Sequence, residues 1–184
     1  MSNPVIELLE ARLATRSIMP VALPDDVIED LVEAARLAPS CRNFQPWRYL
    51  FLTSSMALEN GRNVLAPGNL SWAGTAPLLI IGHTRKEDDC VIKDGRAYHQ
   101  FDLGMSVMNI MLAATHHGLT ARPMAGFDPV KTRAFFDLPD DAEPIIMLAV
   151  GKPGDDEAEH LPEHYRGIEG KRERKDAGEI VTVL

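Results

Sequence analysis

A short polar loop in the first third of the chain contains the residues whose types best suit ligand binding. Residues 38–47 read Ala-Pro-Ser-Cys-Arg-Asn-Phe-Gln-Pro-Trp, with serine, asparagine and glutamine between two prolines. Such a loop exposes backbone donors, and its amide side chains can both donate and accept hydrogen bonds. The loop therefore suits a polar ring ligand, although a helix cap followed by a proline turn would explain the same residues.

The densest cationic run of the chain lies near the C-terminus and is the second set of candidate residues. The run follows an acidic segment, residues 154–163, and the whole protein has a net charge of −8. By itself it is explained by a charged arm in solvent. Its members are Arg166, Lys171, Arg172, Arg174 and Lys175.

Other kinds of chemistry have little support in the sequence. Ser40 is not part of a Gly-x-Ser-x-Gly motif, which argues against a hydrolase. The chain has neither a Walker motif nor a Gly-x-Gly-x-x-Gly fingerprint, so no independent nucleotide-binding fold is indicated. We expect no metal site, because Pro162 interrupts any helix that could align His160 with His164.

The two cysteines, Cys41 and Cys90, have neither metal nor redox spacing. This fits a reducing compartment and argues against a disulfide scaffold, so we expect Cys41 to be a small packing residue. Residues 1–4 show no basic region followed by an apolar core, so we expect no secretory signal and a cytoplasmic location. The net charge of −8 argues against nucleic acid or an anionic membrane as a partner.

The elements around the polar loop follow from apolar spacing. Residues 3–14 show the period of an amphipathic helix, and a second helix is predicted from Asp25 to a point before Pro39. An apolar strand at 49–52 comes after the loop. The loop is therefore expected to connect a helix to a strand.

The segment 96–117 is predicted to form a central helix that Gly118 ends. Between Phe101 and Ala114 its polar residues lie on one thin stripe at helical spacing, Asp102, Ser106 and Asn109, with His99 extending it. A helix that is apolar around most of its circumference is buried on most sides. It should therefore be a core axis or the centre of a subunit interface.

The 184 residues suit a single domain, 1–184.

The order of several motifs resembles the flavin-dependent nitroreductase family. Arg16-Ser17-Ile18 precedes Pro-Ser-x-x-Asn-x-Gln-Pro-Trp at 39–47, and Asn-Leu-Ser-Trp at 69–72 precedes an apolar strand. The central helix, Pro-Met-Ala-Gly at 123–126 and a closing strand at 144–151 follow in the family's order. The resemblance covers nearly the whole chain.

This resemblance implies an α+β fold with a central mixed or antiparallel sheet flanked by helices, in an interlocked homodimer. It also implies one FMN at each of two sites in the interface and a C-terminal arm, about 166–184, that reaches the partner subunit. By the same likeness, Arg16 and Ser17 of one subunit contact the flavin, while Pro39, Ser40, Cys41 and Asn43 approach it from the other. Asn69 matches an asparagine that contacts the edge of the flavin ring, and Pro123, Met124, Ala125 and Gly126 would line the ring face. Arg172 and Arg174 match the family's phosphate-binding pair, and arginine grips phosphate bidentately.

Three departures from the family pattern concern charge near the flavin. Thr15 and Met19 stand where the family often has cations, and Ala125 stands where some members have an acidic residue. Positive charge near the ring stabilises reduced flavin. The flavin affinity and reduction potential therefore depend on other cations, for which the C-terminal run is the candidate.

The function that the resemblance implies is an oxidoreductase that uses NAD(P)H to reduce nitroaromatics, quinones or similar electron-poor acceptors. Hydride would pass to the flavin and then to a small aromatic acceptor in alternating half-reactions, and no catalytic acid–base side chain is nominated. The alternatives are a specialised flavin enzyme of the same fold, such as a dehalogenase or a flavin-fragmenting enzyme, and a flavin-binding protein with little turnover.

Overall fold

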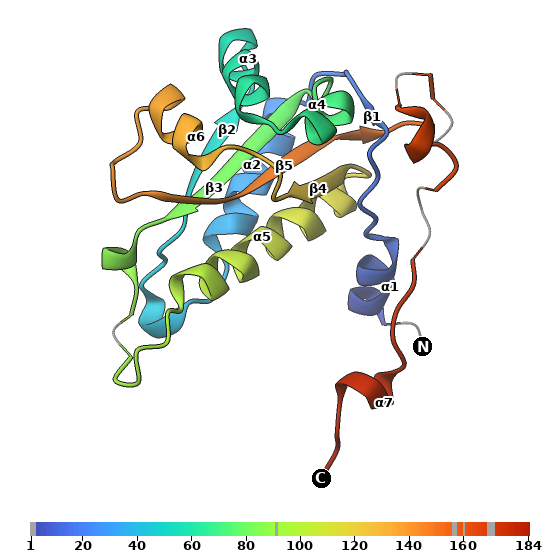
Figure 1. Cartoon of the computed structure of the whole chain (residues 1–184). Helices are drawn as coiled ribbons and strands as arrows, with labels where there is room; N and C mark the ends of the chain where they lie inside the picture. The colour runs from blue at the N-terminus through green and yellow to red at the C-terminus, as the bar shows by residue number, and fades with distance from the viewer. Residues whose placement is uncertain (1–2, 91, 156–157, 160, 169–171) are drawn as a thin grey trace.

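The chain folds as an α+β protein around a five-stranded antiparallel sheet, which confirms the predicted fold class (Figure 1). The computed structural model describes residues 3–90, 92–155, 158–159, 161–168 and 172–184. The strand order is β1-β5-β3-β2, and β4 also pairs with β5. The strands are β1 (Ile18–Met19), β2 (Arg48–Leu52), β3 (Leu78–Thr84), β4 (Thr120–Met124) and β5 (Glu143–Pro153).

Helices cover both faces of the sheet, which explains why β3 is buried along its whole length. One face packs against α2 (Asp25–Arg36) and α5 (His99–His116), and the other against α3 (Ser55–Val64), α4 (Pro67–Ala73) and α6 (Pro129–Phe135) (Figure 1). Successive side chains of a strand point to opposite faces. Accordingly, Leu78 and Ile80 belong to the core under α5, whereas Leu79 and Ile81 belong to the core under α4.

Local sequence signals mark several of the helix ends. The helix α1 (Pro4–Ala11) starts after Asn3, whose Oδ1 accepts a hydrogen bond of 3.0 Å from the Val5 N–H; it is shorter than the predicted 3–14. The helix α5 ends at His116, and Gly118 follows with a positive φ of 67°. The short helical turns are η1 (Cys41–Asn43), η2 (Lys86–Asp88), η3 (Glu163–Tyr165) and α7 (Ala177–Ile180).

The polar stripe of α5 faces the protein interior. The Ser106 hydroxyl donates to the Ala35 carbonyl at 2.9 Å and accepts from the Tyr49 hydroxyl at 2.9 Å. The Asn109 amide donates to the Ala34 carbonyl at 3.1 Å. Because these polar groups find partners on α2 and β2, the stripe fixes the rotation of α5 about its own axis.

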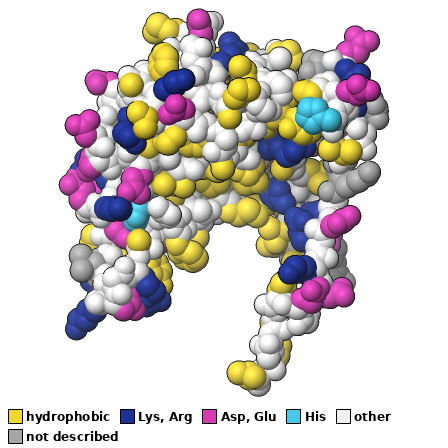
Figure 2. Space-filling model, viewed as in Figure 1, with side chains coloured by type: hydrophobic (Ala, Val, Ile, Leu, Met, Phe, Trp, Pro, Cys, Tyr) yellow, Lys and Arg dark blue, Asp and Glu magenta, His cyan; other side chains and the backbone are white. Residues whose placement is uncertain are grey.

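An apolar row lies about a quarter-turn around α5 from the polar stripe and is left uncovered in the single chain. Its spacing of four, three and four residues keeps it on one helix face. Phe101 is 60% exposed, and the other three members are half-buried. Figure 2 shows hydrophobic side chains gathered along the underside of the body, between two downward projections. The row consists of Phe101, Met105, Met108 and Leu112.

The two projections extend from opposite ends of α5 and form an arch (Figure 1). One contains η1 and the connection that precedes α5. The other contains α1 and the C-terminal segment, which ends beyond α7 away from the sheet. That segment exposes apolar side chains, with Ile180 68% and Val183 92% exposed. Among the described residues, no helix is long and apolar enough to cross a membrane.

Candidate functional site

The predicted site residues fall into two groups at opposite ends of α5. At its amino end, the Cys41 N–H donates to Asp102 Oδ2 at 3.0 Å. Just beyond its carboxyl end, the Thr120 hydroxyl donates to the Leu13 carbonyl at 3.2 Å, next to the segment that contains Arg16. The 18 residues of α5 span roughly 27 Å. One chain therefore cannot bring both groups to one ligand.

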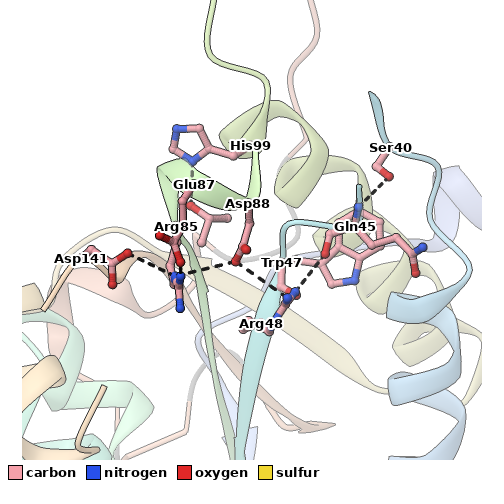
Figure 3. Close-up of polar contacts among 10 residues, drawn as sticks. Ser40, Gln45, Trp47, Arg48, Arg85, Glu87, Asp88, His99 and Asp141 are labelled. Atoms are coloured by element: carbon pink, nitrogen blue, oxygen red, sulfur yellow. Dashed lines mark hydrogen bonds and ion pairs between the residues drawn. The ribbon is translucent and has the colours of Figure 1, made fainter. Parts of the chain in front are cut away.

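The loop around η1 has an unusual backbone. Arg42, Asn43 and Gln45 have positive φ angles of 51°, 61° and 49°, a conformation that costs a residue other than glycine about 1–2 kcal/mol. The Ser40 hydroxyl accepts from the Gln45 N–H at 3.0 Å (Figure 3), and the Gln45 amide donates to Asn43 Oδ1 at 3.1 Å. Backbone strain of this kind persists where surrounding contacts enforce it, often at functional sites.

A disulfide bond joins Cys41 to Cys90, so the expectation that Cys41 is a small packing residue is wrong. The two cysteines are separated by 49 positions, and their Cα atoms lie 6.0 Å apart. The sequence spacing carried no sign of this because two separate connections, one before β2 and one before α5, bring the cysteines together only in the folded chain.

Beneath this loop lies the carboxyl group of Asp102, which is 1% exposed. Burial raises the pKa of Asp102, and the nearby charge of Asp89 raises it further, while the hydrogen bond from Cys41 opposes the shift. Asp89 in turn accepts from the Tyr98 N–H at 2.8 Å through Oδ2. Among the described residues, Oδ1 of each carboxyl group is buried without a hydrogen-bond partner.

The second group begins with Arg16 and Ser17. The Ser17 side chain is fully buried, and its hydroxyl donates to the Asp155 carbonyl. The Arg16 guanidinium lies 4.1 Å from the centre of the Tyr165 ring, a cation–π distance. The Ser17 hydroxyl is therefore already hydrogen-bonded within the chain, and Arg16 is half-exposed.

The structure brings Asn69 and the segment 123–126 together. The Asn69 amide donates to the Gly126 carbonyl at 3.0 Å, and a Cβ on Gly126 would lie 2.7 Å from Asn69 Nδ2. Pro123 and Ala125 are exposed, whereas the Met124 side chain belongs to the core. Any contact of Met124 with a ligand must therefore come from its backbone.

Arg122 is a residue that the sequence analysis missed. Its guanidinium donates to the Ala14 carbonyl and lies 5.4 Å from the Trp72 ring. These contacts place its charge between the segment before Arg16, the helix α4 that carries Asn69, and Pro123 next to it in the chain. The sequence signal that could have identified it is a charged residue within a strand, directly before the matched Pro123.

Three arginines gather where the C-terminal segment crosses α1. The Arg172 guanidinium donates to the carbonyls of Leu9 and Glu10 at 2.9 and 2.8 Å. Burial lowers the pKa of Arg12, and the charges of Arg172 and Arg174 lower it further. Figure 2 shows Lys and Arg side chains aligned over this projection. Arg12 was absent from the predicted site, because it lies four positions before Arg16, where the matched motif begins.

A hollow of about 530 Å³ lies beside the second group, at the carboxyl end of α5. Its volume is within the range of small-molecule sites. Its lining includes Leu13, Thr15, Gly118, Thr120, Gly154 and Asp155. No group of three potential metal ligands occurs among the described residues; His160, considered above, lies outside them.

Comparison with known proteins gives consistent matches. A family model described as "Nitroreductase family" matches residues 9–67 and 56–152. An NADH dehydrogenase of Thermus thermophilus is 27% identical over 199 residues, which cover 90% of this chain and 95% of that protein. A nitroreductase family protein from Clostridium difficile has 25% identity and a TM-score of 0.80, covering 99% of this chain and 98% of the other. The crystal structure of an oxidoreductase containing FMN has 24% identity and a TM-score of 0.85, covering 99% and 91%.

Proposed function

Because this chain belongs to the nitroreductase family, we propose that it is an FMN-dependent oxidoreductase that uses NAD(P)H to reduce electron-poor acceptors. The observation that carries the proposal is the division of the predicted flavin-contact residues between the two ends of α5, with the apolar row between them. Nitroaromatics and quinones are the proposed acceptors, reduced in alternating half-reactions.

A homodimer would complete the site. In a two-fold dimer that buries the apolar row against itself, the projection with η1 of one subunit meets the projection with α1 of the other. The loop at 39–43 would then face Arg16, Asn69 and Pro123–Gly126 of the partner chain. The exposed apolar side chains of the C-terminal segment support the same arrangement, because the described chain leaves them uncovered.

The residues at the second group fit FMN in charge and in shape. Arg12, Arg172 and Arg174 form a cationic cluster in a protein of net charge −8, which suits the phosphate. The close approach of Gly126 to Asn69 leaves no room for a Cβ and presents the backbone and an amide to a planar polar ring. Arg122 supplies a positive charge in the region where Thr15 and Met19 supply none.

The chain would bind and orient the reactants. Bound FMN would supply the two-electron chemistry, taking electrons from NAD(P)H and passing them to the acceptor. Pro123 and Ala125 would contact the ring through exposed backbone and small side chains, and the partner's loop at 39–43 would limit access to it. No side chain is required as an acid or base. Since NAD(P)H is an intracellular reductant, we also propose a cytoplasmic location.

The purified protein tests this proposal directly. We expect a yellow protein with one FMN per chain, whose visible absorption is bleached by NADH or NADPH without oxygen and restored by a quinone or a nitroaromatic. A protein that binds FMN but is not bleached within minutes would be a flavin-binding protein with little turnover. A colourless protein with no affinity for FMN would contradict the proposal.

A further inference from the structure

We propose that the Cys41–Cys90 disulfide is a thiol–disulfide exchange site, at which a dithiol reductant releases the loop that contacts the flavin. The proposal rests on the proposed function for the position of the flavin. The disulfide itself, and the two segments that it joins, are features of the single chain.

The bond joins two connections between the main elements, whose described regular structure consists of the short turns η1 and η2. Cys41 begins η1, in the connection between α2 and β2, and Cys90 follows η2, in the connection between β3 and α5. Another tie between these regions is the ion pair of Arg48 and Asp88 at 3.8 Å, drawn in Figure 3, whose Arg48 side chain is 53% exposed. An exposed pair at that distance contributes little. The disulfide is therefore the strong link between the two connections.

The proposed use of NAD(P)H implies a cytoplasmic location, where dithiols can exchange with such a disulfide. Cells that supply NAD(P)H in the cytoplasm also maintain dithiols there, and disulfides in that compartment are usually transient or redox-sensing. The ratio of reduced to oxidised dithiols would then determine whether the Cys41–Cys90 bond is intact. Through that bond it would affect the loop that contacts the flavin.

Burial indicates which sulfur reacts first. Cys90 is 3% exposed, whereas Cys41 is half-buried. A thiolate of the dithiol would attack Cys41 Sγ, break the S–S bond and release Cys90 as a thiolate that takes up a proton. The second thiol of the reductant would then displace Cys41. The reductant loses two electrons as it becomes a disulfide, and Cys41 and Cys90 gain two electrons and two protons.

The structure gives a physical reason for the loop to move once the bond is broken. Arg42, Asn43 and Gln45 hold left-handed conformations that require enforcement by surrounding contacts. The carboxyl groups of Asp89 and Asp102 lie close enough for the charge of one to act on the other. Breaking the bond would allow both segments to relax, and Asn43 would lose its fixed position.

Hydrogen–deuterium exchange measured on oxidised, dithiothreitol-treated and Cys90→Ser protein tests this. Cys90→Ser breaks the bond but leaves Cys41 in the cofactor loop, and a serine fits the space of a cysteine. We expect no free thiol before treatment and two afterwards. Amide exchange at residues 40–45 and 85–90 should become on the order of tenfold faster in both the treated protein and the variant, while β3 (78–84) is unchanged.

The dissociation constant of FMN, measured on the same samples, should rise about tenfold, which corresponds to about 1.4 kcal/mol. Free thiols in protein purified in air, or equal exchange at 40–45 in all three samples, would overturn the proposal. An unchanged FMN affinity despite faster exchange would also overturn it. A protein that never binds FMN would contradict the proposed function, and the exchange rates would still decide whether the bond restrains the loop.

Discussion

The backbone N–H of Cys41 donates a hydrogen bond of 3.0 Å to the buried carboxyl group of Asp102 on α5. This contact anchors the predicted cofactor loop to the central helix through a side chain that the sequence had placed only on a polar stripe. Asp102 therefore links α5 to the loop, and its burial and charged neighbours determine its pKa.

The first prediction concerns Asp102 and pH. Its pKa is raised in the folded state, above the unfolded value of about 3.9. Between these two values the folded protein binds more protons than the unfolded one, so stability falls as pH rises. Asp102→Asn keeps an oxygen to accept from Cys41 and does not titrate. The free energy of unfolding of wild type minus that of the variant should decrease as pH rises through this window and then level off. A difference that is constant or increasing would contradict the prediction.

The second prediction concerns the apolar row. Met108→Asp places a charge in the proposed interface, which should shift the protein to monomers because the charge would be buried without a partner. Sedimentation velocity at micromolar concentration measures this. Met56→Asp is the matched control, since Met56 is 74% exposed on α3, outside the row. Met111→Asp would not test the interface, because the Met111 side chain is 7% exposed and belongs to the core, where a charge would disrupt folding. A stable, folded wild-type monomer at that concentration would refute the prediction.

The third prediction concerns the arginine cluster. Arg174→Ala and Arg12→Ala should each weaken FMN binding about ten- to a hundredfold, because a hydrogen bond to a charged group contributes roughly 1.5–3 kcal/mol. Riboflavin, which lacks the phosphate, should lose far less. Arg36→Ala is the control, since Arg36 is 63% exposed and forms an ion pair with the exposed Glu33 on the same helix, α2. Equal losses for FMN and riboflavin would mean that the cluster does not bind the phosphate.

The fourth prediction concerns Gly126. The Cβ of Gly126→Ala would lie 2.7 Å from Asn69 Nδ2 and would force the amide to rotate. FMN affinity should fall about tenfold, the equivalent of one hydrogen bond. Gly68→Ala, on the same helix as Asn69, meets no atom within 4 Å and serves as the control. Equal titration curves for the two variants in a flavin fluorescence assay would show that the Asn69 amide has no part in binding.

The fifth prediction concerns Arg122. Arg122→Met should lower the two-electron reduction potential of bound FMN by about 30 mV, the equivalent of about 1.4 kcal/mol, because positive charge near the ring favours the reduced form. Arg122→Lys should restore most of the potential. Thermal unfolding of both variants controls for the lost contacts with Ala14 and Trp72. An unchanged potential in the methionine variant would exclude Arg122 as the compensating charge.

Periodicity was enough to predict the central helix, and the family resemblance that the motif order carries implied the α+β class and the order of the candidate segments. These features depend on local spacing: the stripe of Asp102, Ser106 and Asn109 repeats at helical intervals, and glycine and proline mark where the helices end. The residues of the proposed flavin site follow from the order of the motifs along the chain, and their roles stay predictions.

Only the tertiary structure decided which distant groups meet. The Cys41–Cys90 bond, the position of Arg122 against Trp72, and the approach of Arg172 to α1 each join segments that are far apart in the chain. The rotation of α5, with its polar stripe inward and its apolar row outward, depends on partners that α2 and β2 supply. Local sequence determines where a helix forms, because backbone hydrogen bonds and side-chain spacing act within a few residues. Long-range contacts depend on how all the elements pack around the sheet, and no single stretch of the sequence contains that information.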